Sequence, residues 1–207
     1  MTRPVERVRG REYRSSTAGA EGNARLTGAL GAILLVLLAV EGATILRVRE
    51  LISLHVFVGA LLIPPVLVKM SSAMYRFARY YTGGAEYLRT GPPSTLLRVL
   101  GPLEILTTVA VLGSGVALVE VPRGQGGTWL FLHKASFILW FAVTTIHVLA
   151  HVRESAVLAY RDWGPGTPRG RSAAARARRT RMTLTVVSLI AGVALGAALL
   201  PKAAAWH

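Results

Sequence analysis

The amino-acid sequence predicts an all-α integral membrane protein, a bundle of five transmembrane helices. The chain has 207 residues, of which 52% are hydrophobic, and a mean hydropathy of +0.46, yet its formal net charge is +14. The apolar residues form five long runs, and each run contains at most one charged residue. A helix rises about 1.5 Å per residue, so about 20 residues cross a hydrocarbon core of about 30 Å. Every run is therefore long enough to span a bilayer.

The five helices are expected to follow one another with short outer connections. The predicted spans are 26–46, 51–75, 99–119, 129–152 and 182–200. The parts outside them are a basic N-terminal segment (1–25), a basic loop (153–181) and a short tail (201–207). The outer connections are a tight turn at Arg47–Glu50 and a glycine-rich turn at Val121–Thr128. The first run is too long for a signal peptide and lacks a small-residue cleavage site, so 26–200 is interpreted as one transmembrane domain.

The basic residues predict the orientation of this domain. Eighteen of the 24 lysines and arginines lie in the N-terminal segment or in the loops that a five-span topology places on the same side. The opposite side carries only four, which are Arg47, Arg49, Arg123 and Lys202. Basic loops stay in the cytoplasm, so the N-terminus is expected inside the cell and the C-terminus outside. The arginines are interpreted as a topology signal that also touches anionic lipid, and no nucleic-acid partner is expected.

Several classes of chemistry are excluded by what the chain lacks. It contains no cysteine, which rules out thiolate metal sites, covalent haem attachment and cysteine nucleophiles. The sequence has no phosphate-binding loop or nucleotide fingerprint. Its one aspartate, Asp162, lies in a predicted cytoplasmic loop, so a Ser-His-Asp triad has no support. Any catalysis must therefore use the bundle itself or a partner protein.

Ionisable side chains inside the apolar runs are the candidates for function, because they are costly in a membrane. Three lie about 6–8 Å below the outer surface, by the rise of a helix: Glu41, His55 and His133. Three others lie about 8–9 Å from the inner surface: Lys69, Glu104 and His147. The sequence thus predicts two polar layers within the bundle.

The spacing within the second and fourth helices suggests what the layers hold. His55 and Lys69 are 14 residues apart, as are His133 and His147. Fourteen residues return to within about 40° of the same helix face and rise about 21 Å. Two histidines that face each other from different helices suit axial ligation of a haem iron. Gly59, one turn from His55, would leave room for the porphyrin, and Glu41 would accept a hydrogen bond from a ligand imidazole.

The same two helices carry a resemblance to a known family. The segment LHVFVGALL contains His55, and LHKASFILWFAVTTIHVLAH contains His133, His147 and His151. These segments resemble membrane cytochromes b of bacterial oxidoreductases, such as the haem-bearing subunits of formate dehydrogenase and nickel hydrogenase, and the transmembrane domains of ferric reductases. The resemblance implies haem b and electron transfer with quinone or a partner redox subunit.

The chain departs from that pattern at one position, where Lys69 stands in place of a fourth histidine ligand. An outer haem between His55 and His133 is therefore expected. A second, inner haem would need His147 paired with Lys69, with Met70 or with a residue elsewhere. Lys69 is instead expected to reach the inner surface or to pair with Glu104.

Two other functions are compatible with the sequence. A proton- or metal-linked transporter would use the imidazole and carboxylate groups of the outer layer as zinc ligands. Five helices without an inverted repeat would require a homo-oligomer for that role. A membrane anchor or assembly factor without a cofactor would use its polar residues only to hold the bundle together.

Overall fold

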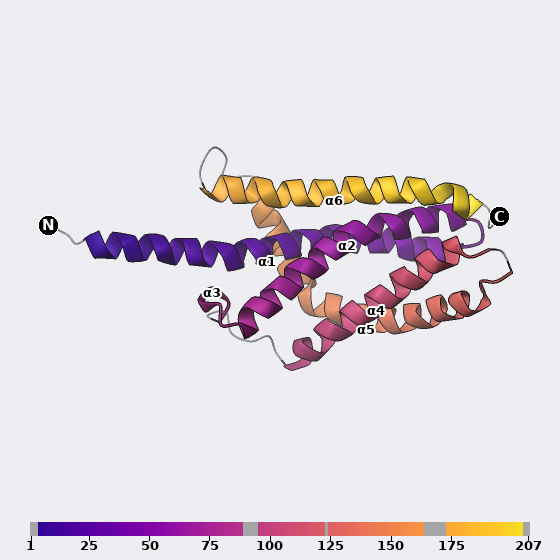
Figure 1. The fold of residues 1–207 in the computed structure, drawn as a ribbon, viewed down its shortest axis with the longest axis horizontal. Helices are drawn as coiled ribbons and strands as arrows, with labels where there is room; N and C mark the ends of the chain where they lie inside the picture. Colours follow the sequence, from indigo (N-terminus) through magenta and orange to yellow (C-terminus); the bar gives the residue numbers. More distant parts are fainter. Residues whose placement is uncertain (1–3, 89–94, 123, 164–172, 205–207) are drawn as a thin grey trace.

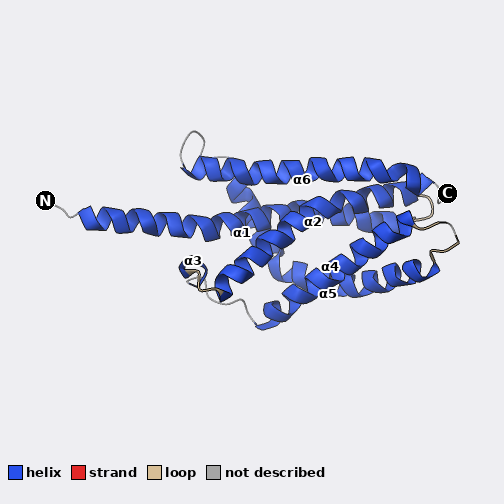
Figure 2. Ribbon diagram, in the orientation of Figure 1, coloured by secondary structure: helices blue, strands red, loops and turns tan. Residues whose placement is uncertain are grey.

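The computed structural model describes residues 4–88, 95–122, 124–163 and 173–204. These residues form six helices, and no strand occurs among them (Figure 2). Their bounds are α1 (Pro4–Ile45), α2 (Ile52–Tyr81), α3 (Ala85–Leu88), α4 (Thr95–Glu120), α5 (Gly127–Trp163) and α6 (Ala173–Ala204). The prediction of an all-α fold is confirmed.

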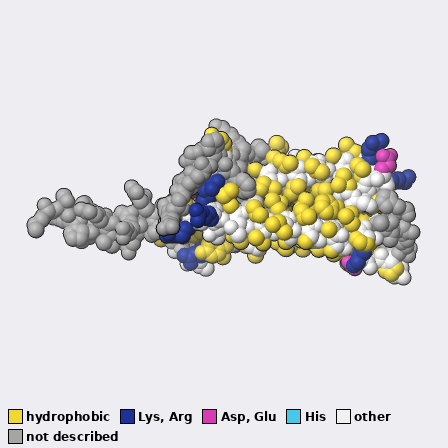
Figure 3. All heavy atoms as spheres, turned by 90° about the horizontal axis from the view of Figure 1, so that it is seen from above, with side chains coloured by type: hydrophobic (Ala, Val, Ile, Leu, Met, Phe, Trp, Pro, Cys, Tyr) yellow, Lys and Arg dark blue, Asp and Glu magenta, His cyan; other side chains and the backbone are white. Residues whose placement is uncertain are grey.

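Five of these helices are long and apolar enough to cross a membrane, which confirms the predicted number of spans. The candidate spans are Gly19–Ile45, Ile52–Tyr81, Arg98–Glu120, Gly127–Leu149 and Ala175–Ala203. Exposed large apolar side chains occur on all five long helices, and on the face shown in Figure 3 hydrophobic side chains form a broad band across the middle of the molecule. Such a band is too extensive for water-exposed surface and indicates contact with the lipid bilayer. The beginning of α1 and the end of α6 lie at opposite ends of the molecule, as an odd number of spans requires (Figure 1).

The helices extend further than the apolar runs that predicted them. The basic segment 1–25 is helical from Pro4, and α5 continues past residue 152 to Trp163. The loop 153–181 also contains the beginning of α6 at Ala173. Arginine, alanine and glutamate favour helix without adding hydropathy, so a search for apolar runs finds only the part of each helix that lies in the membrane.

Helix α6 packs along α2 through two glycines one turn apart. A Cβ added at Gly192 would overlap the backbone oxygen of Leu61, and one added at Gly196 would lie 2.9 Å from the backbone oxygen of Phe57. Pro65 has no N–H to offer the carbonyl of Leu61, four residues earlier in α2. The freed carbonyl thus faces a position where only glycine fits. Small residues spaced by four allow this close approach in membranes.

Polar side chains join the other neighbouring helices. The indole nitrogen of Trp140 in α5 donates to the hydroxyl of Thr108 in α4 over 3.0 Å. The hydroxyls of Thr27 in α1 and Ser72 in α2 lie 2.9 Å apart. Helix α1 also packs against α5, so the four helices α1, α2, α4 and α5 surround a common interior. This interior contains the candidate site.

Candidate functional site

A cavity of about 410 Å³ lies between α1, α2, α4 and α5. Most of its wall is apolar, formed by leucine, isoleucine and valine side chains. All six ionisable residues that the sequence placed in two layers contribute to this wall: Glu41, His55, Lys69, Glu104, His133 and His147. Gly59 lines it as well. The two layers are therefore the ends of one cavity, whose volume falls in the range of small-molecule sites.

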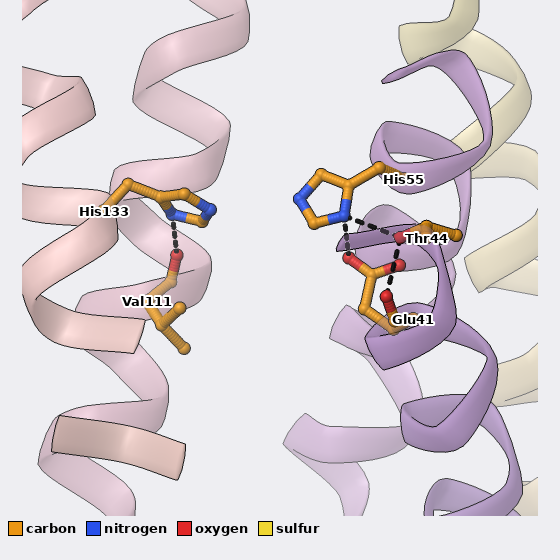
Figure 4. Close-up of polar contacts among 5 residues, drawn as sticks. All are labelled: Glu41, Thr44, His55, Val111 and His133. Atoms are coloured by element: carbon orange, nitrogen blue, oxygen red, sulfur yellow. Dashed lines mark hydrogen bonds and ion pairs between the residues drawn. The ribbon is translucent and has the colours of Figure 1, made fainter. Parts of the chain in front are cut away.

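His55 is held near the beginning of α2 by two groups of α1. Its Nδ1 lies 3.0 Å from Oε1 of Glu41 and 2.9 Å from Oγ1 of Thr44 (Figure 4). The Thr44 hydroxyl gives its own proton to the backbone oxygen of Glu41, so it accepts from the imidazole. Both partners of Nδ1 are acceptors, which places the ring proton on Nδ1. The Nε2 of a neutral His55 then carries a free lone pair.

His133 is held by the neighbouring helix α4 in the same manner. Its Nδ1 lies 3.0 Å from the backbone oxygen of Val111 and 3.2 Å from Oγ of Ser114. A carbonyl oxygen can only accept, so Nδ1 of this ring also carries the proton. The Nε2 of His133 is left with a lone pair directed away from α4. This is the tautomer that metal-bound histidines adopt when a carbonyl or carboxylate orients them.

The two imidazoles face each other across the cavity. Their ring centroids are 6.3 Å apart and their planes are inclined by 77°. In Figure 4 the Nε2 atoms of His55 and His133 point toward one another, while each Nδ1 points back to its own partner. The described residues thus contain two preoriented nitrogen donors with a gap between them.

Two glycines leave room for this arrangement. A Cβ at Gly59 would lie 3.2 Å from Oε1 of Glu41, so this glycine makes room for the carboxylate as well as lining the cavity. A Cβ at Gly115 would lie 3.1 Å from Cε1 of His133. Gly113, in contrast, faces open space. The side chains of Glu41 and His55 are only 14% and 19% exposed.

The inner end of the cavity has a different chemistry. Oε1 of Glu104 accepts a hydrogen bond of 2.9 Å from Thr144, and Lys69 interacts electrostatically with the same carboxylate. The second oxygen of Glu104 is buried without a hydrogen-bond partner, as is the second oxygen of Glu41 in the outer layer. His147 lines this end of the cavity together with Lys69 and Glu104.

Some functional contacts were not predicted from the sequence. Thr44 lies one turn from Glu41, and a polar residue at that spacing in an apolar run was an available signal. Ser114 likewise interrupts an apolar run. The carbonyl of Val111 offers no side-chain signal at all. The side chain of His151, the terminal His207 and the loop residue Arg123 lie outside the described residues.

The geometry also bears on metal binding. Within the part of the chain that the structure describes, no three histidine, cysteine, aspartate or glutamate side chains converge on a common point.

Comparisons with protein-family models, with curated proteins and with solved structures found no match to this chain.

Proposed function

We propose that the protein is a b-type cytochrome that carries electrons in the membrane, with one haem held between His55 and His133. The main observation in support is that the Nε2 atoms of His55 and His133 face each other. Each Nε2 keeps its lone pair, because the proton of the same ring is on Nδ1 and is donated in a hydrogen bond. A buried histidine that serves only to join helices has no need of a second imidazole opposite its free nitrogen. The apolar cavity between the rings suits the flat, apolar face of a porphyrin.

The separation of the rings supports the same ligand. A ligating nitrogen lies about 2 Å from a first-row metal and the ring centroid about 1 Å beyond it, so two imidazoles on one ion have centroids about 6 Å apart. The observed value is 6.3 Å. The inclination of 77° is compatible, because two ring planes that share the N–metal–N axis are free to rotate about it.

The residues of the cavity divide into three roles in this proposal. His55 and His133 bind the iron, which supplies one-electron transfer when it is bound. The carboxylate of Glu41 fixes the ring of His55, and the carbonyl dipole of Val111 fixes the ring of His133. Lys134, which lines the cavity beside His133, offers a cation to a haem propionate near the outer surface.

The electron donor and acceptor must reach this site from outside the chain. The bundle has no room for a second catalytic domain, since the loops between its helices are short. We infer that a partner redox subunit or a quinone exchanges electrons with the haem, in a bacterial cytoplasmic membrane. The chain would then act as an electron-transfer subunit.

One haem is better supported than two. His147 lies at the inner end of the same cavity, where the other ionisable residues in the lining are Lys69 and Glu104. Neither lysine nor glutamate is among the usual protein ligands of haem iron, which are histidine, methionine, cysteine and tyrosine. The zinc-transporter alternative is weakened, since no three candidate ligands converge among the described residues.

The test is the haem content of three histidine variants. His55→Ala and His133→Ala should each lose the haem that the wild type retains through purification. His147→Ala is the matched control, because it lies on α5 with His133 and lines the same cavity. If all three variants kept their haem, the ligand assignment would be wrong. If His147→Ala alone lost it, the haem would lie at the inner end.

A further inference from the structure

A second hollow lies on the outside of the bundle, away from the histidines. It is an open groove of about 690 Å³ between α1, α2 and α6. We propose that this groove binds one anionic phospholipid, with the phosphate beside Arg181 and an acyl chain along Leu26, Leu67 and Leu184. The proposal is independent of haem binding.

The lining of the groove changes from apolar to polar along each of its three helices. On α1 the order is Leu26 and then Asn23, and on α2 it is Leu67 and then Ser71. Helices α1 and α6 run in the direction opposite to α2, yet the apolar residue of each pair lies nearer the membrane centre. On α6 Leu184 is likewise deeper than Arg181. The groove therefore changes from apolar to polar in the same direction as a phospholipid in the cytoplasmic leaflet, from its acyl chains to its headgroup.

The apolar part of the groove faces lipid. Leu67 is 54% exposed and Leu184 is 42% exposed, although both lie within candidate membrane spans. A recess lined by such side chains is filled by an acyl chain in a bilayer, because water has no partners there. Tyr75, at the polar end, has the amphipathic ring that is common at the headgroup level.

The polar part of the groove has the charge that an anionic headgroup requires. Nη1 of Arg181 reaches from α6 to α1, where a Cβ at Gly22 would lie 3.6 Å from it. Arg176, Arg178 and Arg179 precede it on the same helix. Arg25, on α1, is paired with Glu21 over 2.5 Å and is already neutralised. Basic side chains gather where the hydrophobic band ends (Figure 3).

Glu86 lies at the far end of the groove. The carboxylate of Glu86 is 3.0 Å from the position of a Cβ at Gly19, which is further from the membrane centre than Arg181. A phosphate is therefore expected on the Arg181 side. Basic pockets between transmembrane helices on the side of the basic loops bind anionic headgroups by the same electrostatics.

The test compares lipid retention among variants of the full chain. The protein is loaded in vesicles of phosphatidylcholine with phosphatidylglycerol, extracted in mild detergent and washed, and the phosphatidylglycerol bound per chain is measured by native mass spectrometry. The wild type should retain one molecule. Arg181→Gln should weaken its binding about fivefold, as expected for one arginine at a membrane surface, and Arg181→Lys should restore most of it.

Two further variants distinguish a specific lipid site from non-specific attraction of anionic lipid to the basic residues. Leu67→Trp fills the apolar part of the groove without changing any charge, so it should also reduce retention. Arg179→Gln removes the same charge from an exposed position that does not line the groove, and it should retain the lipid. Loss in both Arg181→Gln and Leu67→Trp, with retention in Arg179→Gln, supports the proposal. Unchanged retention in either groove variant, or an equal loss in Arg179→Gln, would overturn it.

Discussion

Glu41 of α1 and His55 of α2 are joined by a contact of 3.0 Å between Oε1 and Nδ1, inside the membrane-spanning part of the bundle. A buried carboxylate is costly unless it is paired, and its second oxygen has no hydrogen-bond partner here. Uncharged groups would join two helices at lower cost, which favours the role that we propose for this pair at a haem ligand. The contact fixes one imidazole in a single tautomer and adds a negative charge behind it.

This relationship leads to a prediction for Glu41→Gln. The amide keeps the size of the side chain but removes the charge, so haem affinity should fall about 10- to 100-fold, as it does when such partners of metal ligands are changed. The midpoint potential of any retained haem should rise, because the lost negative charge favoured the oxidised iron. Haem titration and redox titration measure the two effects. Glu104→Gln removes a carboxylate from the other end of the cavity and is the control. Equal effects of the two changes would contradict a specific role for Glu41.

The position of His133 predicts different outcomes for two nearby glycines. Gly115→Val should displace the imidazole and reduce the haem content, since even the first added carbon would lie 3.1 Å from Cε1 of the ring. Gly113→Val, two residues away on α4, meets open space and should leave haem binding intact. The measurement is the ratio of haem to protein after purification. Haem loss in the Gly113 variant with retention in the Gly115 variant would show that the ring is placed incorrectly.

The contact between α2 and α6 predicts that a larger residue at Gly196 lowers the stability of the bundle without changing the histidine cavity. Gly196→Val should lower the free energy of unfolding by about 1–3 kcal/mol, as overpacking does, because the side chain would meet the backbone of Phe57. Gly101→Val, where no atom lies within 4 Å, is the control. Thermal unfolding in detergent measures the difference. Similar unfolding temperatures for the two variants would mean that α6 packs less closely than described.

The absence of cysteine from the chain allows a direct test of orientation. Gln125→Cys, in the connection between α4 and α5, should react with a membrane-impermeant thiol reagent added to intact cells. Ala85→Cys, at the beginning of α3, should react only after the cells are opened. The reverse pattern would place the basic loops outside and contradict the orientation that the arginines predict.

Much of the fold could be predicted from hydropathy and charge. The five apolar runs became five helices because a bilayer requires every backbone group to be bonded within its own segment. The extension of α1 to Pro4 and of α5 to Trp163 could not be predicted in this way, since these polar turns carry no hydropathy signal. The close packing of Gly192 against Leu61 was also missed, although glycines spaced by four are a recognisable pattern.

The site was predictable to a similar degree. Equal depths placed His55 and His133 in one layer, and the structure brings them into one facing pair. The Glu41 contact follows from the same layer. The carbonyl of Val111 and the choice of tautomer depend on how α4 lies against α5, which no residue spacing within a single helix determines. The space beside the ring at Gly115 depends on the same contact.

The most direct test of the account is a reduced-minus-oxidised absorbance spectrum of the wild-type protein, with a haem-to-protein ratio from the same sample. The protein should be purified from haem-replete cells, so that supply does not limit occupancy. The account predicts a Soret band, a sharp reduced α-band and one haem per chain. A colourless protein from those cells would contradict it and would leave the paired histidines as a structural feature of the bundle.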